Sequence, residues 1–154
     1  TTQTVFSGDT AIQITYDAQG RQPTNCPYGT CKWAGVYWQE PPNNWGKSEF
    51  WKEYGYDLTG YTRLRFWAKA DQTVEIYFKV GGITGPYGDS LVFPRVTQAT
   101  LTPEWQEFEV DLSNTDLSHV IGGFVWVCNW SILRIHGITD KEITFYLDEI
   151  RYEK

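Results

Sequence analysis

Apolar and polar residues alternate with a period of two along most of the chain. The alternation is clear at Ala11–Tyr16, Leu64–Lys69 and Val74–Val80. Because successive side chains of a β-strand point to opposite faces, this pattern predicts strands that are buried on one face only. The same reasoning places further strands at Thr4–Phe6, Trp33–Glu40, Ser90–Val96, Trp105–Leu112, Gly123–Val127 and Ile143–Tyr152.

Turn-forming residues separate these segments, and no segment has a sustained helical period. Gly, Pro and Asn gather at Asp17–Pro23, Pro41–Gly46 and Gly81–Gly88, where they favour tight turns. Only Ser113–Val120 is compatible with a helical turn, with a serine or asparagine as its N-cap. The pattern predicts an all-β fold, an antiparallel β-sandwich or jelly roll of about nine to ten strands with a concave binding face.

Length and charge narrow the classes of partner. The 154 residues suit a single domain over 1–154, and 41% of them are hydrophobic, enough for a core without a metal or disulfide framework. A net charge of -6 gives no basic field for nucleic acid or anionic lipid. No apolar stretch has the length of a membrane span, and the first residues lack the features of a signal peptide. We therefore expect neither nucleic acid nor membrane as a partner, and a secreted protein would be represented here by its mature form.

Aromatic content is the unusual feature of the composition. The chain has 8 Trp, 10 Tyr and 8 Phe, which together make 17% of its residues. An aromatic-rich β core accounts for about two-thirds of these rings, so the remainder are expected to serve a surface.

Two of the three cysteines are close enough in sequence to pair. Cys26 and Cys31 flank a turn that contains Pro27 and Gly29, so we expect a disulfide that rigidifies this loop in an oxidising compartment. Zinc is a weaker alternative, because the histidines have no ligand spacing relative to the cysteines. Cys128 is expected to be a buried free thiol.

No catalytic motif is present among the common ones. The chain has no Gly-x-Ser-x-Gly, His-Glu-x-x-His or phosphate-binding glycine loop. A glycosidase needs two carboxyl groups across a cleft, and pairs such as Glu107 with Glu109 have the pattern of an exposed polar strand face. We therefore expect a protein that is not an enzyme.

Aromatic residues close to polar ones suggest a different chemistry. Planar rings stack on the apolar faces of sugars, while neighbouring polar side chains bind the hydroxyl groups. The candidate carbohydrate-binding residues are Tyr37, Gln39, Trp45, Tyr77, Lys79, Tyr87, Asp89, Trp126 and Trp130.

Several segments resemble, in order, a bacterial non-catalytic carbohydrate-binding module of the β-sandwich type, similar in layout to families four, eleven and twenty-two. The segments are Trp33–Gln39, Asn44–Gly46, Tyr56–Tyr61, Leu64–Lys69, Tyr87–Ser90, Trp105–Leu112, Ile121–Phe124 and Phe145–Ile150. The resemblance implies a groove on the concave sheet that binds single β-glucan or xylan chains. The chain departs from the family's pattern at Lys47–Tyr54 and Cys128–Asp140.

Matched by position, the resemblance implies a sugar-stacking role for Trp126 and places the acid Asp89 at the groove. Residues 33–38 match another groove-lining strand. Its two alternating faces both carry aromatics, and we expect Tyr37 and Gln39, rather than Trp38, to point outward.

The resemblance also implies a structural calcium ion near the first and last strands. The corresponding C-terminal residue is Asp148, whose carboxylate lies within an apolar strand and would be stabilised by a cation. Asp9, in an N-terminal turn, is the expected second ligand, and its alternative is a solvated turn residue.

Together these features predict a secreted, monomeric module that binds plant-cell-wall polysaccharide without cleaving it. The expected ligand is an internal stretch of β-glucan, in mixed-linkage glucan, xyloglucan or amorphous cellulose, and the expected partner is an attached glycoside hydrolase domain. The alternatives are a small β-sandwich glycoside hydrolase or lyase and a protein-protein adhesion domain.

Overall fold

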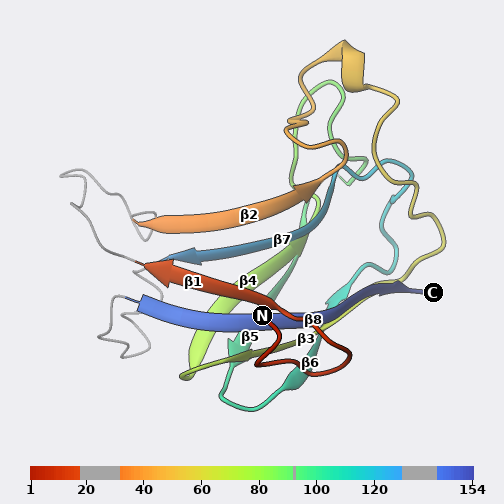
Figure 1. The fold of residues 1–154 in the computed structure, drawn as a ribbon. Helices are drawn as coiled ribbons and strands as arrows, with labels where there is room; N and C mark the ends of the chain where they lie inside the picture. Colours follow the sequence, from red (N-terminus) through yellow and green to blue (C-terminus); the bar gives the residue numbers. More distant parts are fainter. Residues whose placement is uncertain (18–31, 92, 130–141) are drawn as a thin grey trace.

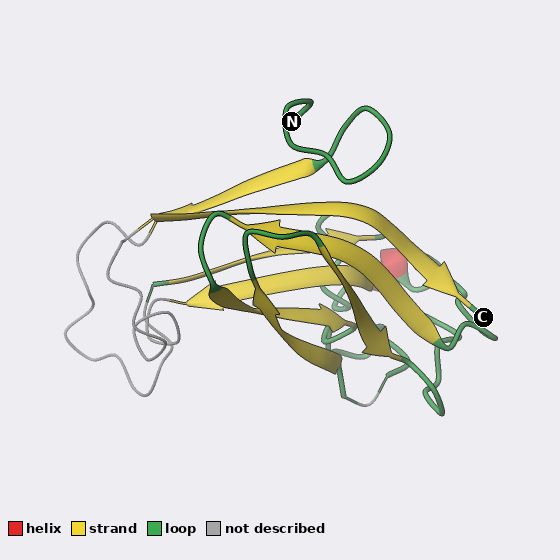
Figure 2. Cartoon of the chain, turned by 90° about the horizontal axis from the view of Figure 1, so that it is seen from below, coloured by secondary structure: helices red, strands yellow, loops and turns green. Residues whose placement is uncertain are grey.

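The computed structural model describes residues 1–17, 32–91, 93–129 and 142–154, and shows a β-sandwich (Figures 1 and 2). Its elements are β1 (Ile12–Asp17), β2 (Trp33–Gln39), the 3-10 helix η1 (Glu49–Trp51), β3 (Arg63–Ala70), β4 (Val74–Val80), β5 (Arg95–Leu101), β6 (Gln106–Asp111), β7 (Gly122–Asn129) and β8 (Glu142–Glu153).

The strands form two four-stranded antiparallel sheets. Sheet A has the order β1-β8-β3-β6 and sheet B the order β2-β7-β4-β5. The all-β sandwich expected from the period-two pattern is thus confirmed. Among the described residues η1 is the only helix, and none is long and apolar enough to cross a membrane.

Two of the nine expected strands differ in the structure, and so does the expected helical turn. Thr4–Phe6 is not a strand, and the strand expected at Ser90–Val96 lies at β5 instead. Pro94, which has no N–H to donate, precedes β5 and explains the later start. Ser113–Val120 forms turns rather than a helix, because Asp111 and Asp116 accept hydrogen bonds from the backbone two residues on.

The two sheets are joined by an aromatic core. Phe66 of sheet A packs between Phe78 and Phe124 of sheet B, with ring centroids 4.5 and 5.5 Å away, and all three rings are buried. These contacts decide which alternating set of each strand faces inward, and therefore which set faces outward.

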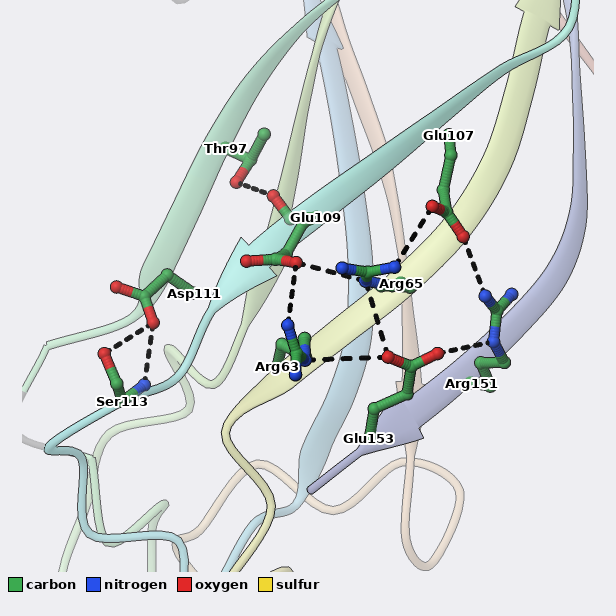
Figure 3. Close-up of polar contacts among 9 residues, drawn as sticks. All are labelled: Arg63, Arg65, Thr97, Glu107, Glu109, Asp111, Ser113, Arg151 and Glu153. Carbon is green, nitrogen blue, oxygen red and sulfur yellow. Dashed lines mark hydrogen bonds and ion pairs between the residues drawn. The ribbon is translucent and has the colours of Figure 1, made fainter.

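The outer face of sheet A is occupied by ion pairs (Figure 3). Arg65 of β3 contacts Glu107 at 3.2 Å and Glu109 at 3.1 Å on β6, and Arg151 of β8 contacts Glu107 at 2.7 Å. Arg63 and Glu153 extend the same network. The prediction that Glu107 and Glu109 share one strand face is confirmed.

The N-terminal segment covers another part of the same face, beside β1 (Figure 2). Phe6 stacks on Trp67 with ring centroids 3.7 Å apart and planes 12° apart. The Asp148 Oδ2 atom accepts the N–H groups of Phe6 at 2.9 Å and Ser7 at 3.1 Å. A β8 carboxylate thus anchors the chain that leads to β1.

Tyr152 links the two sheets near the C-terminal end. Its hydroxyl on β8 donates to the carbonyl oxygen of Gly123 on β7. Burial raises the pKa of this hydroxyl, and the nearby negative charge of Asp89 raises it further.

The raised pKa predicts a loss of stability in alkali. Because the Tyr152 pKa is higher in the folded than in the unfolded protein, Tyr152 makes its full contribution to the free energy of unfolding below about pH 10. At higher pH it falls by about 1.4 kcal/mol per pH unit. Urea unfolding midpoints, measured between neutral and alkaline pH, should fall less steeply in Tyr152→Phe than in the unsubstituted protein, and parallel slopes would contradict the assignment.

Candidate functional site

The outer face of sheet B carries an uncovered set of aromatic and polar side chains. On β4, Phe78 points into the core, so Tyr77 and Lys79 point outward. Tyr37 of β2 and Lys79 both pair with Val125 of β7, which places them on the same outer face. The expected outward orientation of Tyr37 is therefore confirmed.

Trp33 extends this set at the start of β2 and was not among the predicted binding residues. Its side chain is 61% exposed, and its ring lies 3.7 Å from the position of a Cβ atom on Gly35. The sequence could have indicated Trp33, because it belongs to the same alternating set of β2 as Tyr37. The glycine between these two residues also leaves space beside the Trp33 ring.

Trp45 lies at the other end of the face, beside Tyr37. The two ring centroids are 5.5 Å apart and the planes are inclined by 58°. The indole Nε1 donates to Asn43 Oδ1 at 3.1 Å, and the ring is 48% exposed. The structure thus brings together two of the candidate residues, Tyr37 and Trp45, with one ring on a strand and the other on a loop.

Two loops meet at this end of sheet B, where η1 and the segment between β4 and β5 rise side by side (Figure 1). The N–H of Tyr87 donates to the carbonyl of Gly46 at 3.0 Å. A Cβ atom on Gly85 would lie 2.5 Å from that carbonyl oxygen, so only glycine allows this approach. Tyr87 therefore contributes to the site through its backbone, by fixing the loop that carries Trp45.

Asp89 was expected to face the groove, but its carboxylate instead accepts hydrogen bonds from three backbone N–H groups. Its Oδ1 accepts the N–H groups of Ile121 at 2.6 Å and Gly122 at 3.1 Å, and its Oδ2 accepts that of Ile83 at 2.7 Å. The carboxylate thereby holds the β4–β5 loop against the start of β7, directly behind Tyr37.

His119 fixes the same two loops from a second side. Its Nδ1 lies 2.8 Å from the carbonyl oxygen of Gly88, and its Nε2 lies 2.5 Å from that of Tyr54. The imidazole thus bridges the β4–β5 loop and the loop that follows η1.

Polar groups on the outer face have limited net charge. The Tyr77 pKa is raised by partial burial, by the charge of Glu75 and by a hydrogen bond to Glu75, so the neutral phenol is favoured. Lys79, on the same strand as Glu75, supplies one positive charge. The face combines nearly balanced charge with exposed rings, which suits a neutral ligand that has both apolar and hydroxyl surfaces.

Trp126 is placed differently from the prediction, which was wrong. It pairs with Phe78 and Val36, its ring packs edge-on against Phe145 at 5.3 Å, and it is only 4% exposed. Because β7 is an inner strand of sheet B, its inward set fills the core, and Trp126 belongs to that set.

Other predicted residues lie apart from the outer face or outside the described residues. Gln39 was expected on the outer face with Tyr37, and this was wrong: it follows a β-bulge and lines a cleft on the flank of the sandwich together with Trp38. Trp130, Cys26 and Cys31 lie outside the described residues. Cys128 is a buried free thiol, as expected, and burial raises its pKa to about 12.

The two expected calcium ligands, Asp148 and Asp9, have different surroundings in the structure. Asp148 accepts two N–H groups at Oδ2, and its Oδ1 accepts the N–H of Glu149 at 2.8 Å. Asp9 is exposed, and the described part of the chain has no cluster of three or more His, Cys, Asp or Glu residues. Both oxygens of the Asp148 carboxylate therefore accept N–H groups, which compensates part of its charge.

Comparison with known proteins finds similarity among solved structures. No protein-family model matches the chain, and no curated protein matches it. The chain is similar to TmCBM61 in complex with beta-1,4-galactotriose, with a TM-score of 0.43 and 13% identity, over 97% of this chain and 73% of that one. It is also similar to a CBM4 structure, with a TM-score of 0.34 and 18% identity, over 79% of this chain and 57% of that one.

The close approach of the two loops predicts a site-specific effect of Gly85→Ala. A Cβ atom at Gly85 meets the Gly46 carbonyl oxygen, whereas one at Gly60 meets nothing within 4 Å, although both residues have positive φ. Gly60→Ala should cost about 1 kcal/mol for backbone strain alone. Gly85→Ala should cost more, because the loops must also separate.

The NMR signal of the Trp45 indole N–H reports this separation. It should shift in Gly85→Ala and stay in place in Gly60→Ala, which is the matched control. Equal unfolding midpoints and an unmoved Trp45 signal in both variants would show that the loops do not depend on this contact.

Proposed function

We propose that the chain is a non-catalytic carbohydrate-binding module that binds polysaccharide on the outer face of sheet B. The observation that carries this proposal is the outward row formed by Trp33, Tyr37 and Trp45, in which both tryptophans are exposed, with Tyr77 and Lys79 beside it. Sheet A offers no comparable face, because its outer side holds ion pairs and the stacked Phe6 and Trp67.

The spacing of the rings favours a chain rather than a single sugar. Trp33 and Tyr37 are four residues apart on β2, or about 13 Å along a strand, and Trp45 continues the row beyond Tyr37. A ligand that contacts all three rings has several sugar units. We therefore propose internal stretches of β-glucan chains, in mixed-linkage glucan, xyloglucan or amorphous cellulose, as the ligand.

The described carboxylates support binding without cleavage. A glycosidase needs one carboxyl group that stays protonated as an acid and a second across a cleft. Glu107 and Glu109 are paired with arginines. Three aspartates accept hydrogen bonds that lower the pKa values of their carboxyl groups and favour the ionised form. These are Asp57 with Thr59, Asp111 with Ser113, and Asp116 with Ser118.

A non-catalytic module of this kind acts by holding an attached enzyme on its substrate. We accordingly propose a secreted, monomeric module that is linked to a glycoside hydrolase. This part of the proposal depends on the binding function.

Affinity electrophoresis tests the binding function. The protein should be retarded in gels that contain barley β-glucan, xyloglucan or hydroxyethylcellulose, with no release of reducing ends from the same polymers. Release of reducing ends would identify a hydrolase. Normal migration in every gel, together with a mass that increases with protein concentration, would instead favour a protein-protein adhesion domain.

Trp33→Ala tests the row of rings. Removing one stacking ring should cost about 2 kcal/mol, or roughly thirtyfold in affinity for the retarding polymer. Phe6→Ala is the matched control, since it removes a partly exposed ring on the opposite sheet and should leave retardation unchanged. Undiminished binding by a folded Trp33→Ala protein would remove this ring from the site.

A further inference from the structure

A cavity lies on the flank of the sandwich, between the β2 edge of sheet B and the C-terminal half of β8. Its volume is about 520 Å³, within the range of about 300–1,000 Å³ for small-molecule sites. The lining comes from both sheets and from the loop after η1. The lining residues are Trp38, Gln39, Tyr56, Leu58, Gly123, Phe124, Ile150 and Tyr152.

This flank cleft is separate from the outer face of sheet B. Trp38 belongs to the alternating set opposite Tyr37, and its ring leans on the core residue Phe124 with centroids 5.3 Å apart. Beyond Trp38 the register shifts, so that Gln39 pairs with Gly122 and leaves Gly123 as an extra residue of β7. A Cβ atom on Gly122 would meet Tyr37, whereas one on Gly123 would meet Tyr56 and Tyr152.

The lining combines exposed rings with an unused hydrogen-bond donor. Trp38 is 38% exposed and Tyr56 is 47% exposed. The Gln39 side-chain nitrogen is buried and has no hydrogen-bond partner among the described residues. An unpaired buried donor costs about 1–3 kcal/mol and is rare in folded proteins. Turning this side chain into the cleft would let an acceptor on a ligand offset the cost of the unpaired donor.

The charge of the lining narrows the class of ligand. None of the lining residues is acidic, basic or a histidine, so a charged ligand would lose its hydration without gaining a counter-ion. A purely apolar ligand would leave the Gln39 amide unpaired. A neutral ring with one apolar face and several hydroxyl oxygens satisfies both the aromatic walls and the amide.

We propose that the flank cleft is a second carbohydrate site, which binds one or two neutral sugar units at the end of a saccharide. The ring of the sugar stacks against Trp38 or Tyr56, and one of its hydroxyl oxygens accepts from the Gln39 amide. The cleft volume of about 520 Å³ has room for one or two sugar units, which a disaccharide or the end of a longer chain supplies. This site is independent of the polysaccharide site on sheet B.

Titration with neutral disaccharides tests the proposal. Cellobiose, laminaribiose, xylobiose and lactose are added in turn, and the indole N–H signals are followed by NMR, with Trp38→Phe used to assign the Trp38 signal. At least one disaccharide should shift the Trp38 signal in a saturable way. A response confined to the Trp33 and Trp45 signals, or no response at all, would overturn the flank site.

Two adjacent glycines provide a matched pair of variants. Gly123→Ala adds a methyl group to the floor of the cleft in ordinary contact with Tyr56 and Tyr152, at 3.7 Å. Gly122→Ala adds the same group on the opposite face, 3.5 Å from Tyr37. Gly123→Ala should bind the disaccharide about tenfold more weakly, and Gly122→Ala should bind it as the unsubstituted protein does. Equal affinities in the two variants would contradict the proposal.

Gln39→Met separates binding from folding. It replaces the buried amide by an apolar side chain of similar length, so the unfolding midpoint should stay the same or rise. The Trp38 response to the disaccharide should weaken about tenfold. Undiminished binding would show that the amide does not contact a ligand. Polymer retardation by the sheet B face is measured in parallel, so that failure of either site is recognised separately.

Discussion

The packing of aromatic rings between the two sheets is the constraint on which the rest of the structure depends. Phe66 contacts Phe78 and Phe124 across the sandwich, and this fixes the inward set of β3, β4 and β7. Since strand residues alternate, the outward set is fixed at the same time. The outward orientation of Tyr77 on β4 follows from these buried contacts, and so does that of Tyr37 on β2 through its pairing with β7.

The two outer faces use their polar residues differently. On sheet A, Arg65 and its neighbours neutralise one another in a network whose side chains are about one-third exposed. Pairs of this exposure contribute little to stability individually, but they leave no free aromatic surface. On sheet B the exposed rings of Trp33 and Trp45 are not covered by another element of the described chain, so they are available to a ligand.

Sequence reasoning located seven of the nine expected strands and part of the outer face of sheet B, and it failed where periodicity carries no information. The alternating sets of β3 and β4 identified the core and the outward Tyr77 and Lys79. Trp126 was misplaced because the run Gly123–Val127 is apolar at both alternating sets, so that its inward set is not visible in the sequence.

Loop contacts were the second gap in prediction. The three backbone hydrogen bonds of Asp89 depend on a loop conformation that brings residues 83, 121 and 122 together. The approach of Gly46 to Gly85 depends on backbone conformations that a glycine-rich sequence permits but does not specify. Trp33 was overlooked for another reason, because exposure of a ring depends on the neighbouring strands and loops.

The bulge of β7 has a consequence for how the two proposed sites are related. In a regular register Gly123 would pair with Gln39, and the alternation of β2 would continue to its end. Because adjacent strand residues point to opposite faces, Gly122 lies beneath Tyr37 and Gly123 faces Tyr56 and Tyr152, and the extra residue leaves Gly123 without a partner on β2. Neither position carries a side chain that would fill the space on its side. The two glycines therefore leave room both beneath the aromatic row and in the flank cleft, so that β2 and β7 serve two separate surfaces.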